Sequence, residues 1–102
     1  ENIEEILTTP GIDGAFIGPY DLSASMGIPG DLNHVDMQDA MERVLESCKK
    51  HNVAPGLHII SPQIEEVNKR LEQGYRLIAY SLDTVMLTHI CKDVSNITRW
   101  DR

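Results

Sequence analysis

The chain has 102 residues, with 16 acidic against 9 Lys and Arg side chains, so its formal net charge is −7. This acidity argues against binding to nucleic acid, whose phosphates need a basic face, and against binding to an anionic membrane surface. Hydrophobic residues make up 41% and charged residues 25%, as in globular domains, which argues against wholesale disorder. We therefore expect a single compact domain, because 102 residues are too few for two.

No targeting or anchoring segment is recognisable. No apolar run approaches the roughly 20 residues of a membrane span, and the start of the chain is acidic rather than basic and then apolar. Cys48 and Cys91 have no metal-ligand spacing, so we expect reduced thiols in a cytoplasmic protein. The chain lacks an initiator Met and opens in what reads as the middle of a helix, which predicts a piece of a longer protein.

The chain begins with a short helical pattern from Asn2 to Leu7, which Pro10-Gly11 ends. The apolar run Gly14 to Ile17 follows and suits a strand that is buried on both faces. Gly18-Pro19 stops this strand. From Tyr20 to about Val35 the chain is rich in Gly, Pro, Asp and Ser, and we expect a loop there that includes Met26.

The rest of the chain predicts three more helices and two more strands. Asp36 is expected to cap the second helix, and Ser61-Pro62 to cap and open the third, which Gly74 ends. Asp83 or Thr84 is expected to cap the last helix. Each of these helices has an apolar stripe on one face: Met37, Met41, Val44, Leu45 and Cys48 in the second; Ile64, Val67 and Leu71 in the third; Leu87, Ile90, Cys91 and Val94 in the last. The two further strands are expected from Val53 to Ile60, with an irregularity at Pro55-Gly56, and from Leu77 to Leu82.

Strands that alternate with helices predict a parallel sheet in an α/β layer architecture with right-handed crossovers. A sheet of three parallel strands has two unpaired outer edges and is a poor free-standing unit. Either the chain is a fragment or another copy covers those edges.

Polar residues gather where the strands end, which is where parallel α/β folds place their active sites. Asp21 follows the first strand and suits a hard divalent cation, although its spacing alone favours a cap of the turn through Leu22-Ser23. His58 suits a base or a substrate contact, although a hydrogen-bonded histidine at a strand end is the simpler interpretation. Asp83 is more simply a helix cap than a site carboxylate. His34, His51 and His89 lack convincing ligand spacing, and no P-loop or G-x-G-x-x-G motif is present.

Residues 11–27, with the sequence GIDGAFIGPYDLSASMG, resemble the "vDGvfiGPaDLsasmG" segment of the metal-dependent (class II) pyruvate aldolases. These are the 4-hydroxy-2-oxo-heptane-dioate and 2-keto-3-deoxy sugar-acid aldolases of the phosphoenolpyruvate/pyruvate barrel superfamily. Residues 53–56 (VAPG) resemble the family's "kaaG" strand, and residues 74–84 (GYRLIAYSLDT) its "Ga.fvavGvDt" strand and turn. The resemblance thus covers nearly the whole chain. It implies the C-terminal portion of a (β/α)₈ TIM barrel, strands six to eight with their helices, from a barrel of about 250 residues.

The resemblance also implies site residues. Asp21 matches one of two metal-binding carboxylates, and the backbone N–H groups of Tyr20 and Asp21 match the groups that orient the substrate. His58 stands where the family commonly has an apolar residue near the aldehyde, so Tyr20, Asp21 and His58 are the expected substrate-binding residues. The second carboxylate, an arginine and a His/Asp pair lie upstream in the family, so no catalytic residue is assigned within this chain. Tyr20 and Ser81-Leu82 replace a small residue and Gly-Val of the family pattern.

The implied activity is that of a carbon–carbon lyase. A divalent metal (Mg²⁺, Mn²⁺ or Co²⁺) would serve the aldol cleavage or condensation of 2-keto-3-deoxy or 4-hydroxy-2-oxo acids, which yields pyruvate and an aldehyde. The partners expected are a small oxo acid and further copies of the chain, as a homo-oligomer and by family resemblance a hexamer, with the helix from Thr84 to Asn96 as the exchanged element. The alternatives are a non-catalytic half-barrel with an assembly role, because the upstream residues are missing, and a related citryl- or malyl-thioester lyase.

Overall fold

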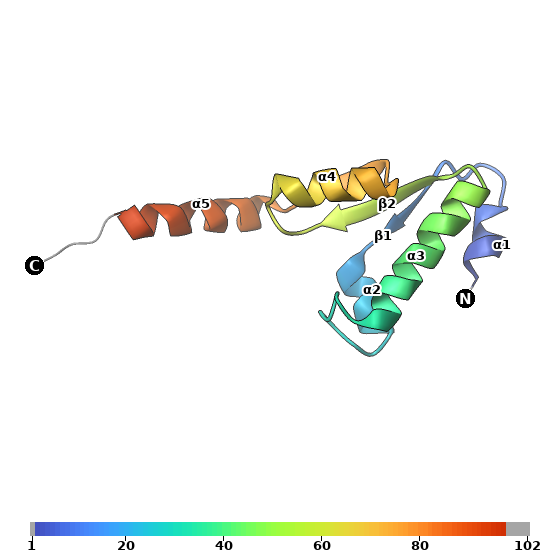
Figure 1. Ribbon diagram of the computed structural model, residues 1–102, viewed down its shortest axis with the longest axis horizontal. Coiled ribbons are helices and arrows are strands. Elements are labelled where there is room, and N and C mark those ends of the chain that lie inside the picture. The colour runs from blue at the N-terminus through green and yellow to red at the C-terminus, as the bar shows by residue number, and fades with distance from the viewer. Residues whose placement is uncertain (1, 98–102) are drawn as a thin grey trace, which may run out of the picture.

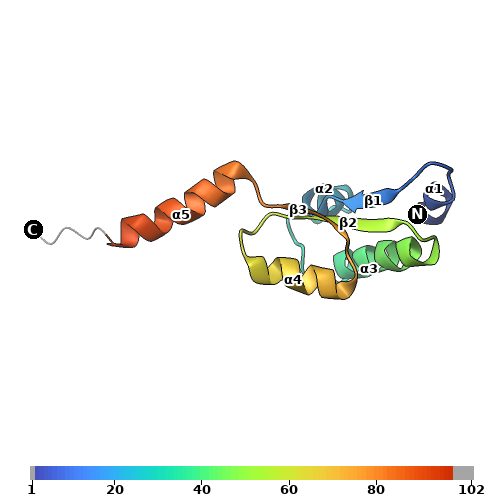
Figure 2. The same ribbon diagram turned by 90° about the horizontal axis from the view of Figure 1, so that it is seen from above.

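The computed structural model describes residues 2–97, with side chains as far as residue 94, and forms a three-stranded parallel sheet with helices. Figures 1 and 2 show the elements, which run α1 to α5 and β1 to β3. No helix of the described residues is long and apolar enough to cross a membrane. The element bounds are α1 Ile3–Leu7, β1 Gly14–Ile17, α2 Pro19–Ser25, α3 Val35–Lys50, β2 Ala54–Ile59, α4 Ile64–Gln73, β3 Leu77–Tyr80 and α5 Asp83–Ile97.

The sheet has the order β1-β2-β3, so each strand pairs with the next one along the chain. Gly14 pairs with Ala54 at the start of β1, and Gly56 pairs with Leu77 at the start of β3. Helices α3 and α4 lie on one side of the sheet, below the strands in Figure 2. The described residues leave the opposite side open. The parallel α/β architecture expected from the alternation of strands and helices is therefore confirmed.

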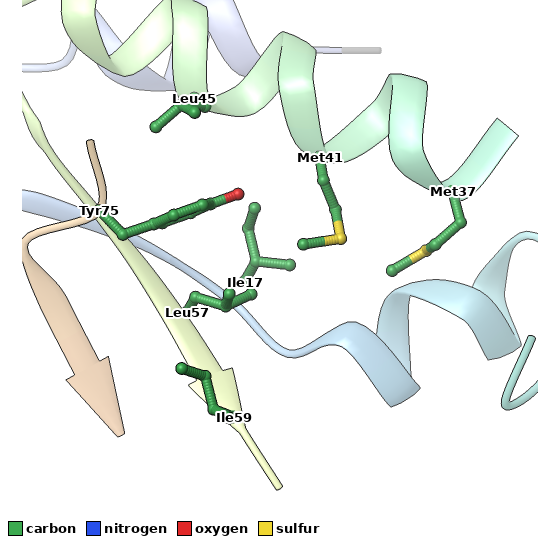
Figure 3. Packing of buried hydrophobic residues seen from close by; sticks show 7 residues of the cluster. All are labelled: Ile17, Met37, Met41, Leu45, Leu57, Ile59 and Tyr75. Carbon is green, nitrogen blue, oxygen red and sulfur yellow. The ribbon is translucent and has the colours of Figure 1, made fainter. Parts of the chain in front are cut away.

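The core lies between the sheet and α3. Met37 and Met41 of α3 face Ile17 of β1 and Leu57 of β2, as Figure 3 shows. Met37 is fully buried, and the ring of Tyr75 lies between the sheet and Leu45 with 2% exposure. The helical stripe read from the sequence is therefore the face that packs on the sheet.

Successive side chains of each strand point to opposite faces of the sheet, so one face packs on this core and the other face is open. We define the open face by Gly14, Phe16, Gly56, His58, Leu77 and Ala79, which alternate with the core residues in the paired register. Phe16 and Leu77 are half exposed there, at 48% and 49%, whereas Ile17 and Leu57 on the other side are buried. A Cβ on Gly56 would lie 2.7 Å from Phe16 Cδ2, so the Phe16 ring covers the glycine.

Helix α5 projects away from the sheet, at the far end of the molecule in Figures 1 and 2. Its apolar residues Leu87, Ile90 and Val94 are 54–65% exposed. The stripe that the sequence predicted for this helix is present, but it is not buried within the described part of the chain.

The segment after β1 differs from the expected loop. Residues Pro19 to Ser25 form α2, and Met26 is the C-cap residue at the start of the turn that follows. Pro19 occupies the first helical position, where a missing N–H costs nothing, and Asp21 lies in the first turn, where the helix dipole favours a carboxylate. The hydroxyl of buried Ser23 donates to Tyr20 O and accepts from Gly30 N–H, which ties α2 to the following turn.

Several expected helix caps are also corrected. His34, not Asp36, caps α3, because His34 Nδ1 accepts the Asp36 N–H at 3.2 Å. Helix α4 begins at Ile64 after Gln63, not at Ser61-Pro62, and its first turn closes through the bond from Glu66 N–H to Gln63 O. Gly74 ends α4 in the left-handed region, as predicted.

The expected strand bounds are nearly those observed. Strand β2 runs through Pro55 and Gly56 in regular pairing with β1, so the irregularity expected there is absent from the ladder. Strand β3 stops at Tyr80 because Ser81 takes a left-handed φ of 54°, which no strand residue can adopt.

Candidate active site at the carboxyl ends of the strands

The turn after β1 places Asp21 at the carboxyl edge of the sheet. Gly18 is extended (φ −93°, ψ 99°), Pro19 starts α2, and the Leu22 N–H donates to Gly18 O at 2.9 Å. The N–H groups of Tyr20 and Asp21 belong to the first turn, where a helix offers no carbonyl to receive them. The Asp21 side chain is exposed to solvent.

The Asp21 carboxylate folds back over Gly18. A Cβ on Gly18 would lie only 2.9 Å from Asp21 Oδ2, so the carboxylate occupies the space that a larger residue would fill. Gly18 is two residues beyond Phe16, and an extended chain alternates its side chains, so this space lies on the open face of the sheet. The carboxylate thus lies on the side of the sheet opposite α3 and α4.

His58 lies near the end of β2 and is held by the next strand. Its Nε2 lies 2.9 Å from the backbone oxygen of Ser81. A carbonyl oxygen can only accept a hydrogen bond, so Nε2 carries the proton and Nδ1 is left for another partner. The hydrogen-bonded histidine at a strand end that the sequence favoured is therefore what the structure shows.

Three hydrogen bonds fix Ser81 and its carbonyl. Its N–H donates to Ile59 O at 2.6 Å, its hydroxyl donates to Ile60 O at 2.8 Å, and its carbonyl accepts from His58. The side chain is buried although φ is positive, a conformation that only a well-held non-glycine residue keeps. Sequence reasoning did not assign Ser81 a role. The signal was the glycine that the aldolase pattern has at this position.

The register brings Asp21 and His58 to the same level of the open face. Ile17 pairs with Leu57, and one further residue along each strand places Gly18 beside His58. Paired residues of neighbouring strands are separated by about 5 Å. The Asp21 carboxylate therefore lies on the β1 side of His58, whose ring is bonded to Ser81 on the β3 side.

Tyr20 takes a different place. Tyr20 and His58 both line a cleft of about 280 Å³ between α2, α3, the end of β2 and α4, but Asp21 is not among the residues that line it. The Tyr20 side chain is half exposed. The structure therefore places Asp21 and His58 at the carboxyl ends of neighbouring strands and associates Tyr20 with the neighbouring cleft.

A metal ion would find one ligand here. No cluster of three or more His, Cys, Asp or Glu side chains lies close enough within the described residues to hold an ion. The exposed carboxylate of Asp21, in the space above Gly18, fits as one oxygen ligand of a hard divalent cation. The Asp83 carboxylate instead accepts the Thr84 N–H at 2.7 Å. Because α5 begins at Asp83, neither Asp83 nor Thr84 is the capping residue that the sequence predicted.

The remaining titratable candidates lie away from this edge. His51, at the end of α3, forms an ion pair with Glu4 of α1, and Ser47 and Lys50 donate to the same carboxylate. These hydrogen bonds hold the pKa of Glu4 at about 2. Burial raises the pKa of the free Cys48 thiol, which packs in a second core cluster with Leu7 and Val53, and the free Cys91 thiol is exposed.

Comparison with known proteins decides the family. A family model described as HpcH/HpaI aldolase/citrate lyase matches residues 1–90. The chain belongs to this family. A 2-keto-3-deoxy-L-rhamnonate aldolase of Klebsiella pneumoniae is 40% identical over 88 residues, and a hydroxypyruvate/pyruvate aldolase of Paraburkholderia phytofirmans is 36% identical over 87 residues. These matches cover 86% and 85% of this chain but only 32% and 33% of the relatives, so the chain spans about a third of their length.

Solved structures of the HpcH/HpaI family agree. A family protein from Burkholderia cenocepacia superposes with a TM-score of 0.85 at 38% identity, covering 92% of this chain and 36% of that one. An aldolase from Desulfitobacterium hafniense superposes with a TM-score of 0.86 at 27% identity, covering 98% and 39%. The partial barrel expected from the sequence is therefore confirmed, and the three strands with their helices form that part of the family fold.

Proposed function

We propose that the complete protein is a metal-dependent aldolase that cleaves 2-keto-3-deoxy or 4-hydroxy-2-oxo acids to pyruvate and an aldehyde, or catalyses the reverse addition. The observation that carries the proposal is the Asp21 carboxylate at the carboxyl edge of a parallel sheet in a chain of the HpcH/HpaI family. The names of the relatives, which are aldolases for rhamnonate-derived and pyruvate substrates, support the substrate class.

Asp21 is the residue of this chain that would hold a divalent metal, Mg²⁺, Mn²⁺ or Co²⁺, together with ligands from outside the chain. A bound divalent cation supplies Lewis-acid stabilisation of the negative charge that develops when the carbon–carbon bond breaks. The first-turn N–H groups of Tyr20 and Asp21 have no helical acceptor, and they would orient the carboxylate of the oxo acid. The Asp21 carboxylate would thus hold the metal ion, and the backbone N–H groups beside it would orient the substrate.

The test replaces Asp21 by Asn in the complete protein, which keeps the side-chain shape and removes the charge. We expect kcat/KM for pyruvate release from a 4-hydroxy-2-oxo acid to fall by more than about 100-fold, because several kcal/mol of charge stabilisation depend on the metal. The matched control is Asp31→Asn, which alters an exposed carboxylate in the turn after α2 and should leave activity unchanged. Full activity of Asp21→Asn with unchanged metal dependence would remove Asp21 from the site.

We also propose that the complete protein is a homo-oligomer, a hexamer by family resemblance. Helix α5 supports this, because it exposes Leu87, Ile90 and Val94 on one face and projects from the sheet. Light scattering on the complete protein measures the assembly. A monomer at micromolar concentration would contradict the proposal.

A further inference from the structure

We propose that Ser23 is a positioning residue of the site, which acts through the peptide between Tyr20 and Asp21 to hold and polarise the Asp21 N–H group that would orient the substrate carboxylate. The inference rests on the aldolase function proposed above and adds a residue to it. Three features carry it: the two hydrogen bonds of the Ser23 hydroxyl, the complete burial of Ser23, and the rigidity of the peptide that the hydroxyl contacts.

Both hydrogen-bonding roles of the Ser23 hydroxyl are fixed by its partners. Ser23 Oγ lies 2.8 Å from Tyr20 O and 3.0 Å from Gly30 N. A carbonyl oxygen can only accept a hydrogen bond and a backbone N–H can only donate one, so the hydroxyl donates to Tyr20 and accepts from Gly30. The hydroxyl is therefore held in one orientation, with its proton on Tyr20 O.

The bond to Tyr20 O reaches the candidate substrate-binding group through one rigid unit. The carbonyl of Tyr20 and the N–H of Asp21 belong to the same trans peptide, which is planar, so the direction of one fixes the direction of the other. Linked hydrogen bonds also polarise one another, so a donor at the carbonyl makes the N–H of that peptide a stronger donor. Ser23 thus sets both the direction and the strength of the Asp21 N–H.

The burial of Ser23 is complete within the described part of the chain. Its exposed fraction is 0% there, and further residues of the barrel can only add contacts. Water cannot replace either partner of a fully buried hydroxyl, which keeps both hydrogen bonds in place. The geometry around Ser23 therefore does not depend on the parts of the family fold that lie outside this chain.

The second bond ties the same hydroxyl to the turn after α2. Gly30 has a left-handed φ of 78°, and its N–H donates to Ser23 Oγ. The Ile28 N–H donates to Ser23 O at 3.0 Å, so the side chain and the backbone of Ser23 both hold this turn. Loss of the hydroxyl therefore affects the turn as well as the Tyr20–Asp21 peptide, and control variants must separate the two effects.

Ser25 is the matched control for the bond within the helix. Its hydroxyl donates to Leu22 O at 2.8 Å, the same step of three residues that Ser23 makes to Tyr20. Ser25 is exposed, and the peptide that follows Leu22 carries the Ser23 N–H rather than that of Asp21. Ser25→Ala therefore removes the same kind of bond from α2 without touching the Tyr20–Asp21 peptide.

Gln38 is the control for the turn. Its side-chain amide, from α3, donates to Leu32 O at 2.6 Å and so holds the same turn from the other side. Gln38→Ala removes this bond and leaves the Ser23 hydroxyl with both of its partners. An effect that comes from a loosened turn should therefore appear in Gln38→Ala as well.

The experiment compares KM and kcat of Ser23→Ala and wild type in the complete protein, with a 4-hydroxy-2-oxo acid as substrate. The substrate carboxylate is bound alike in the ground state and in the transition state, so a weaker Asp21 N–H should raise KM and leave kcat nearly unchanged. We expect KM to rise roughly 3- to 10-fold, the worth of about one neutral hydrogen bond. Ser25→Ala and Gln38→Ala should leave KM unchanged, and Ser23→Cys, with a weak S–H donor, should lie between Ser23→Ala and wild type.

Binding measurements separate positioning from a merely structural role. The affinity for Mn²⁺, followed by electron paramagnetic resonance, reports on the Asp21 carboxylate and should be equal in Ser23→Ala and wild type. The affinity for pyruvate at saturating Mn²⁺, measured by calorimetry, should fall with the rise in KM. A lower melting temperature with unchanged KM and pyruvate affinity would overturn the proposal, and so would an equal rise of KM in Gln38→Ala or a matching loss of Mn²⁺ affinity.

A separate readout tells this inference from the proposed function. Exchange of the pyruvate methyl protons with deuterated water, followed by NMR, requires enolate formation but no aldehyde. If the wild-type protein shows neither metal-dependent exchange nor cleavage of the oxo acid, the aldolase proposal fails and this inference fails with it. If the wild type shows both and Ser23→Ala has the same KM, only the role of Ser23 is wrong.

Discussion

Gly56 in the central strand β2 offers the sharpest test of the packing on the open face. A Cβ placed on Gly56 would lie 2.7 Å from Phe16 Cδ2, 3.2 Å from Ala15 O and 3.2 Å from Leu77 Cβ. The Phe16 ring is half exposed and can rotate away, but the other two atoms are fixed by the strand ladders on both sides. Gly56→Ala is therefore expected to push the strands apart.

The expected magnitude combines two opposing effects. Overpacking a well-filled position costs about 1–3 kcal/mol, and the reduced freedom of the unfolded chain returns about 0.4–1 kcal/mol on replacing Gly by Ala. We expect a net loss of about 0.5–2 kcal/mol in the free energy of unfolding. Urea unfolding of the complete protein, followed by circular dichroism and analysed by linear extrapolation, resolves such a difference.

Gly14 is the matched control, since it lies on the same face of the neighbouring strand. Its nearest contacts would be Ala54 O at 3.3 Å and the movable Leu77 Cδ2 at 3.7 Å, so Gly14→Ala should change stability by less than about 0.5 kcal/mol. Combining Gly56→Ala with Phe16→Ala should relieve only part of the cost, because the contact with Ala15 O remains. Equal losses at Gly56 and Gly14, or no loss at Gly56, would refute the argument.

Three further changes test other parts of the fold. Met37→Ala removes a fully buried side chain from the core between α3 and the sheet, and urea unfolding should show a loss of about 2–5 kcal/mol. Gly74→Ala forces an alanine to a φ of 113° and places its Cβ against the Lys49 side chain. The melting temperature should therefore fall by an amount equivalent to about 1–3 kcal/mol. An unchanged melting temperature would mean that α4 can end differently. The pKa of Glu4 is about 2 in the folded protein, below its ordinary value of 4.5, so its stabilising effect is complete above pH 4.5 and disappears as the pH falls toward 2. The difference in unfolding free energy between wild type and Glu4→Gln should therefore shrink over that pH range, and a difference that is constant from pH 6 to pH 2.5 would contradict the ion pair with His51.

The strands and the longer helices could be predicted from the sequence, because the spacing of the apolar residues and the length of each apolar stretch distinguish a strand from a helix. The run Gly14 to Ile17 is a strand, and the stripe that begins at Met37 is the buried face of α3. Helix α2 was missed because Gly, Pro, Asp and Ser together suggest a loop. Its sequence nevertheless carries a helix start, with Pro19 at the first position and Asp21 in the first turn.

The candidate site could be predicted only in part. The position of Asp21 at the end of a strand follows from the order of the elements, but its fold over Gly18 depends on the exact turn. The bond between His58 and Ser81 depends on a left-handed backbone at a serine, which no residue pattern specifies on its own. The predicted cap of α3 was wrong because the His34 side chain, two residues earlier, accepts the free N–H group of Asp36.

The strand order β1-β2-β3 has a consequence for the sequence of folding events. Gly56 pairs with Leu77 across α4, whereas Gly14 pairs with Ala54 across α2, the following turn and α3, which is about twice the length of chain. Each doubling of a closed loop costs about 0.6 kcal/mol of chain entropy. We therefore expect the parallel β2–α4–β3 unit to form first, and β1 to join a ladder that already exists.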